Sequence, residues 1–173
     1  MARVGNEQGS PGNAASGSGW VGSTTGQIPF PASQAASADA NTLDDYEEGT
    51  WTQALKFGGA AVGLVMGTQV SEYTKIGNRV LINGNATLTT KGSSVGAATI
   101  TAVPFTSGQG SYSLAYLSGG VGFAGMASVR VAAGTTQIDF YDSAEITGSI
   151  AALDDTDFND GDSWSFTGNY TVA

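Results

Sequence analysis

Two clusters of acidic residues hold the side chains in this sequence that are most able to do chemistry. One is residues 43–51, LDDYEEGTW, which places four carboxylates within five positions. The other is residues 155–162, DTDFNDGD, in which oxygen-bearing side chains recur. A pair of carboxylates across a sugar-binding cleft is the machinery of a glycosidase, and alternating oxygen ligands are typical of a calcium loop. Catalysis and calcium binding are therefore the two chemistries to weigh.

The surroundings of both clusters favour solvated carboxylates instead. Both lie on turn-like segments beside glycine, where acidic side chains are usually hydrated. The second cluster also departs from the EF-hand pattern, since Gly161 comes one position late and Phe166 stands in place of the bidentate Glu. We expect no catalytic residue, no metal site and no cofactor. We interpret residues 43–51 as an acidic, solvated segment that leads into the first strand.

The composition argues against several other classes of function. There is no histidine, which removes the commonest general base and zinc ligand, and no cysteine, which removes disulfides and thiolate metal sites. The net charge is −9 with six Lys and Arg residues, which disfavours binding to nucleic acid or to anionic membranes. We expect no membrane insertion, because no apolar stretch is long enough to span a bilayer, and no secretory signal.

Alternating side chains from Trp51 onward predict a series of short β-strands. Residues 51–57, 79–88 and 163–172 each place larger apolar or aromatic side chains on one face and polar ones on the other. Gly77-Asn78 separates two such segments by two residues, which predicts a tight hairpin turn. Residues 154–158 could form one helical turn, capped by an aspartate.

These patterns together predict the fold class. Many short strands joined by Gly-rich turns, with 12% charged residues, are typical of an all-β protein and not of a helical bundle. We expect an antiparallel β-sandwich or jelly roll of about eight to ten strands over residues 43–173. No internal repeat indicates a propeller or a β-helix.

Residues 1–42 have a different composition, which predicts an extended Gly/Ser-rich N-terminal arm. Such a segment orders only when it lies against something else, such as a neighbouring subunit or a larger assembly. Its large apolar side chains are the ones able to anchor it there. They are Trp20, Ile28 and Phe30.

Several separate motifs in this order carry a resemblance to a known family. LDDYEEGTW at residues 43–51 is followed by LKFGG at 55–59 and YTKIG at 73–77, and LDDTDF at 153–158 precedes GNY at 168–170. Together they resemble the β-domain found at the ends of many bacteriophage tail fibres and related virion proteins. The sequence differs from the family at Gln53, where members usually carry Pro. The residues of the main motif are Leu43, Asp44, Asp45, Tyr46, Glu47, Glu48, Gly49, Thr50 and Trp51.

The resemblance implies a structural protein on the surface of a phage particle, made in the cytoplasm of the host bacterium. We expect a short homotrimeric fibre or spike subunit of a tailed bacteriophage, joined to other virion proteins through its N-terminal arm. Its display domain would take part in attachment to a glycan or protein of the host surface. A capsid decoration or head-fibre protein, a polysaccharide-cleaving enzyme and a bacterial carbohydrate-binding module are the alternatives.

The part of the chain that would face the host is expected in residues 109–149. Gly-rich loops there lie between predicted strands that bear tyrosines, a mixture suited to adaptable polar recognition. The expected binding residues are Tyr112, Tyr116 and Tyr141. Aromatic residues on strands are more often part of the core or of a subunit interface, so those two interpretations stay open beside it.

Overall fold

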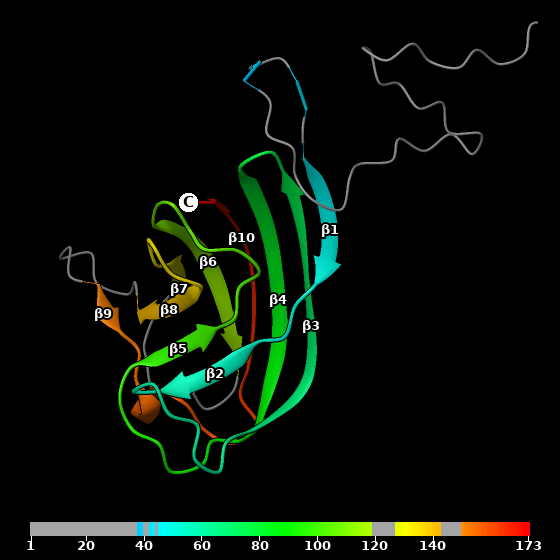
Figure 1. Cartoon of the computed structure of the whole chain (residues 1–173). Helices are drawn as coiled ribbons and strands as arrows, with labels where there is room; N and C mark the ends of the chain where they lie inside the picture. Colours follow the sequence, from blue (N-terminus) through cyan, green and yellow to red (C-terminus); the bar gives the residue numbers. More distant parts are fainter. Residues whose placement is uncertain (1–37, 40–41, 44, 119–126, 143–149) are drawn as a thin grey trace, which may run out of the picture.

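The computed structural model describes residues 38–39, 42–43, 45–118, 127–142 and 150–173. These residues form ten β-strands and one short 3-10 helix (Figure 1). The strands are β1 (Tyr46–Thr50), β2 (Ala54–Phe57), β3 (Val65–Ile76), β4 (Arg79–Thr90), β5 (Ala98–Thr101), β6 (Ser111–Ser118), β7 (Ala127–Val131), β8 (Gln137–Asp142), β9 (Ala151–Ala152) and β10 (Ser163–Thr171), and the helix is η1 (Asp155–Asp157). The anchor residues expected in the arm, Trp20, Ile28 and Phe30, lie outside the described residues.

The strands belong to one antiparallel sheet, which confirms the predicted all-β class and strand number. Its order is β1-β3-β4-β10-β6-β7-β8-β5-β2, with β9 added beside β8. The two strands at the ends of this order, β1 and β2, are consecutive along the chain and are joined by residues 51–53. The sheet therefore curls until its two edges approach each other, and one of its faces encloses the core (Figure 1).

The long hairpin of β3 and β4 forms the centre of one half of this curled sheet. It turns at Gly77-Asn78, as the sequence predicts, with Ile76 paired to Arg79. Gly77 has a φ of 56°, whereas Asn78 does not have a positive φ. A positive φ at the first central position is the mark of a type II′ turn, in which glycine is preferred.

The core lies on the concave face, and its aromatic residues join the two halves of the sheet. Phe140 of β8 packs edge to face against Trp164 of β10, with ring centroids 5.9 Å apart. Phe158 contacts both rings and also Phe57 of β2. Of the residues predicted to face inward on β4 and on the last strand, Val172 is partly buried and the others are buried: Val80, Ile82, Ala86, Leu88, Trp164, Phe166 and Tyr170.

The predicted helical turn is confirmed as η1, with Asp154 as its N-cap. The side chain of Asp154 accepts a hydrogen bond from the Thr156 amide, and Asp157 accepts one from the Asp154 amide. Farther on, Asp155 accepts from the Gly96 amide, and Asp160 accepts from the Lys91 amide. In this second acidic cluster the carboxylates hold loop backbone in place.

No helix of the described residues is long and apolar enough to cross a membrane.

Candidate binding face

Residues 46–50 of the acidic motif belong to the sheet, which corrects the interpretation of the motif as a segment that leads into the first strand, whereas Glu47 and Glu48 are exposed as expected. Tyr46–Thr50 form β1, paired antiparallel with β3 from Glu72 to Ile76. Asp45 is 8% exposed and forms an ion pair with Lys75, which is 4% exposed. The Asp45 carbonyl also accepts a hydrogen bond from the Gly77 amide. Each buried charge of this pair is therefore stabilised by the other, as burial of ions requires.

Alternate residues of the motif face the same side as Asp45 and each meets a specific neighbour on β3 or β4. Tyr73 donates a hydrogen bond to Glu47, which raises the pKa of the Tyr73 hydroxyl to about 12. A Cβ atom on Gly49 would lie 2.6 Å from that tyrosine ring, so the ring occupies the space that a side chain would need. Trp51 donates through Nε1 to the Asn83 carbonyl at 3.2 Å. Asp45, Glu47, Gly49 and Trp51 are thus explained by their contacts with the hairpin.

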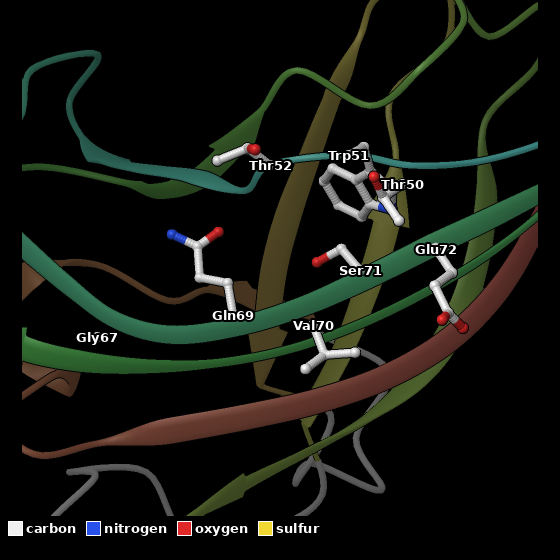
Figure 2. Close-up of a pocket in the computed structure, with 8 residues that line it drawn as sticks. All are labelled: Thr50, Trp51, Thr52, Gly67, Gln69, Val70, Ser71 and Glu72. Atoms are coloured by element: carbon white, nitrogen blue, oxygen red, sulfur yellow. The ribbon is translucent and has the colours of Figure 1, made fainter.

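A groove of about 470 Å³ opens where the chain leaves β1 and crosses to β2 (Figure 2). Gln69 and Ser71 point toward the crossing segment, whereas Val70 and Glu72 point to the opposite side of β3 (Figure 2). Its lining residues are Thr50, Trp51, Thr52, Gly67, Gln69, Val70, Ser71 and Glu72. Glu72 is the one titratable side chain among these eight, so the groove offers hydrogen bonds but no pair of acid and base.

Gln53 holds this crossing segment in place through hydrogen bonds. It is the position at which the sequence differs from the family that it resembles. It is 1% exposed, and its Oε1 accepts a 2.7 Å hydrogen bond from Trp164 Nε1. Its Nε2 donates to Ser71 Oγ, and its backbone amide donates to Gln69 Oε1. A proline here would lack both the amide hydrogen and the side-chain partners, so glutamine is matched to the buried Trp164.

The outward side of β6, β7 and β8 carries the tyrosines predicted to bind the host surface. We call this surface the tyrosine face. It consists of Tyr112, Leu114 and Tyr116 from β6, Ser128 and Arg130 from β7, and Gln137, Asp139 and Tyr141 from β8. Tyr112, Leu114 and Tyr116 are 56%, 64% and 71% exposed, so in this chain they are not core residues.

Strand register brings these side chains into rows across the face. Tyr112 lies opposite Arg130, which lies opposite Asp139. In the next row Leu114 lies opposite Ser128, which lies opposite Tyr141. Directly opposed residues in an antiparallel pair point to the same side of the sheet, which is why three strands contribute to one surface. Tyr116 continues the line along β6 and lies opposite Ser165 of β10.

Arg130 connects the two tyrosines at the centre of the face. Its guanidinium carbon lies 5.9 Å from the Tyr112 ring centroid and 5.1 Å from that of Tyr141, and the two rings are 6.2 Å apart. Its Nη2 donates a 2.7 Å hydrogen bond to Asp139, whose carboxylate raises the pKa of Arg130 above its usual value. Gln137 also donates to Asp139. Burial raises the pKa of the Tyr141 hydroxyl.

The structure thus brings together Tyr112 and Tyr141 and places Tyr116 on the same surface. Sequence reasoning missed Leu114, Arg130 and Asp139. Their positions could have been found from alternation, because Val129, Val131, Ile138 and Phe140 mark the inward positions of two predicted strands. Of the two Gly-rich loops expected to contribute, the one at residues 118–125 lies outside the described residues from 119 on, and the one at residues 132–135 joins β7 to β8.

The face contains residue types that are common in binding surfaces. Within the described part of the chain, no group of three or more acidic side chains is placed to hold a metal ion.

Comparison of the sequence with protein-family models and with curated proteins, and of the structure with solved structures, finds no match.

Proposed function

We propose that this chain is a non-enzymatic recognition protein that attaches to a host cell surface through the tyrosine face. The observation that carries the proposal is the exposure of Tyr112, Leu114 and Tyr116 in one continuous line. Contiguous exposed apolar surface is uncommon on a small monomeric domain and marks sites of interaction. The arginine and carboxylate among the rings supply polar contacts of the kind found in recognition surfaces.

The roles of the acidic residues support binding without catalysis. A glycosidase needs one carboxyl group free to donate a proton and another free to attack or activate water. Asp45 is paired with Lys75, while Asp155 and Asp160 accept hydrogen bonds from backbone amides in a loop. These three carboxylates stabilise the fold, a role that requires no reaction.

The place of the protein is proposed from the family resemblance. On that basis it is a short homotrimeric fibre or spike subunit on the surface of a tailed bacteriophage, with Trp20, Ile28 and Phe30 anchoring its N-terminal arm to other virion proteins. Three copies would present three tyrosine faces together, and simultaneous engagement of several weak sites strengthens attachment without any further contact. A decoration protein of the capsid would use the same face in many more copies per particle.

The test is adsorption of particles that carry altered tyrosines. We expect Tyr112→Ala combined with Tyr116→Ala to lower the adsorption rate at least tenfold while the protein stays on the particle. Tyr46→Ala is the matched control, because Tyr46 is an exposed tyrosine on β1, an end strand of the sheet order, whereas β6 lies in the middle of that order. Unchanged adsorption of the double variant would refute the proposal. The copy number per particle separates a tail fibre from a capsid protein.

A further inference from the structure

The tyrosine face has a geometry that suits one chemical class of ligand. Tyr112 and Tyr116 stand on the same side of β6, four residues apart, so their attachment points are separated by roughly 13 Å along the strand. Leu114 lies between them, and all three are more than half exposed. Their side chains project from the sheet, whereas the anchor residues of protein interfaces usually fill well-packed pockets.

Flat rings that project into solvent are suited to stacking against other flat, weakly polar surfaces. The ring of a pyranose sugar has such a surface, formed by its C–H groups, with hydroxyl groups around its rim. A chain of a few sugar units spans a distance comparable to that between Tyr112 and Tyr116. The hydroxyls would meet small polar groups at the border of the face, among them Ser165 opposite Tyr116 and Gln137 on β8.

The charges of the face decide which sugars fit. Arg130 is its cationic residue, and its charge is compensated by Asp139 in contact with it. The protein as a whole carries a net charge of −9, which repels anions at long range. A sugar acid would therefore find neither a free cation nor an attractive field. We infer that the tyrosine face binds a neutral oligosaccharide segment that lies along β6, an inference that rests on the proposed function.

Arg130 acts in this site as a positioning residue. Its guanidinium lies beside the rings of both Tyr112 and Tyr141, 5.9 and 5.1 Å from their centroids, and is held by Asp139, so it supports both rings in their positions. Lysine could keep the charge but could not stack on both rings or retain the planar contact. Preorganised rings bind more tightly because less freedom is lost on binding.

The experiment is electrophoresis of the full-length protein through native gels that contain polysaccharides. The neutral probes are dextran, mannan and galactan, and the acidic probes are alginate and polygalacturonate. We expect retardation by at least one neutral probe and by neither acidic one. Tyr116→Ala should weaken that binding about tenfold, and Tyr46→Ala should leave it unchanged.

Arg130→Lys gives a second readout that separates positioning from simple folding. We expect severalfold weaker binding together with shifted ring-proton resonances of Tyr112 and Tyr141, while the unfolding midpoint changes little. Binding equal to that of the unaltered protein would remove the positioning role. Preference for the acidic probes, or retardation by none of the five, would overturn the saccharide inference.

Two further outcomes keep the inference separate from the proposed function. If adsorption of particles depends on Tyr112 and Tyr116 but none of the probes binds, the surface recognises something other than a neutral sugar and the proposed function stands. If Leu114→Ser and Tyr116→Ala instead convert a trimer into monomers by light scattering, the face is a subunit interface and the inference is wrong.

Discussion

The acidic motif at residues 43–51 and strand β6 differ in opposite ways from what their residue types suggest. The motif is rich in carboxylates, yet Asp45 is buried against Lys75, and Glu47 accepts a hydrogen bond from Tyr73. β6 has the alternating large side chains of a core strand, yet Tyr112, Leu114 and Tyr116 face solvent. The carboxylates of the motif suggest chemistry, but they stabilise the fold. The large side chains of β6 suggest a core, but they form the exposed surface.

The difference arises because alternation shows that a strand has two faces but does not show which face is inside. That choice depends on the neighbouring strands, which are distant in sequence. The inward side of β6 carries the smaller Ala115 together with Leu117, because Trp164 and Phe166 of β10 lie directly opposite and fill the core there. The small Ala115 on β6 is matched to the large Phe166 on β10.

The ion pair of Asp45 offers the strongest test of the structural role of the motif. Asp45→Ala leaves Lys75 buried without a partner, so we expect the free energy of unfolding to fall by about 3 kcal/mol. Replacing both residues, Asp45→Leu with Lys75→Met, should recover most of the loss because no unpaired charge remains. Urea denaturation measures both. Glu48→Ala, at an exposed position of the same motif, serves as the control, and a similar loss there would contradict the assignment.

A substitution of Gln53 tests how the segment that joins the end strands β1 and β2 is held in place. Gln53→Ala removes the acceptor of Trp164 Nε1 and the partner of Ser71, which leaves buried polar groups unpaired. We expect a loss of about 2 kcal/mol in the free energy of unfolding. Asn85→Ala on the outward side of β4 should change it by less than about 0.5 kcal/mol. Equal effects of the two variants would show that the hydrogen bonds of Gln53 add nothing.

Much of the fold could be predicted from local pattern, because its determinants are local. The Gly77-Asn78 hairpin, the two-faced alternation of β4 and β10, and the turn capped by Asp154 all depend on residues close together in sequence. The joining of ten strands into one curled sheet could not be predicted, because it depends on pairings such as β10 with β4 and β6 across distant segments.

The candidate site was predictable only in part, because some of its features are local in sequence and others depend on pairing between distant strands. Tyr112, Tyr116 and Tyr141 could be selected by residue type and their place between Gly-rich loops. That Arg130 contacts two of the rings follows from the registers of β6 with β7 and of β7 with β8. The burial of Asp45 follows from its long-range neighbour Lys75, and no local rule distinguishes it from the exposed acids beside it.

A smaller effect is expected from the hydroxyl of Tyr73. Its hydrogen bond to Glu47 raises its pKa to about 12, above the ordinary value of 10.0. The proton is held more tightly in the folded state, so this contribution to stability is complete below pH 10 and is lost as the pH rises toward 12. In spectrophotometric titration, Glu47→Gln should lower the pKa of Tyr73 toward 10. A Tyr73 pKa that is the same in the variant would show that the hydrogen bond is absent in solution.

Substitutions on the tyrosine face are expected to have the smallest effect on stability, in contrast to substitutions in the acidic motif. Tyr116 and Leu114 make their contacts with solvent in the single chain, so Tyr116→Ala and Leu114→Ser should each change the free energy of unfolding by less than about 0.5 kcal/mol. The same substitutions are expected to lower host adsorption, whereas Asp45→Ala should lower stability and leave adsorption intact wherever the protein remains folded. Urea denaturation of the isolated protein and adsorption of particles below the unfolding temperature measure the two properties separately. A loss of several kcal/mol in Tyr116→Ala would mean that the ring is buried by a neighbouring subunit, because a truncation costs that much only when a side chain is packed.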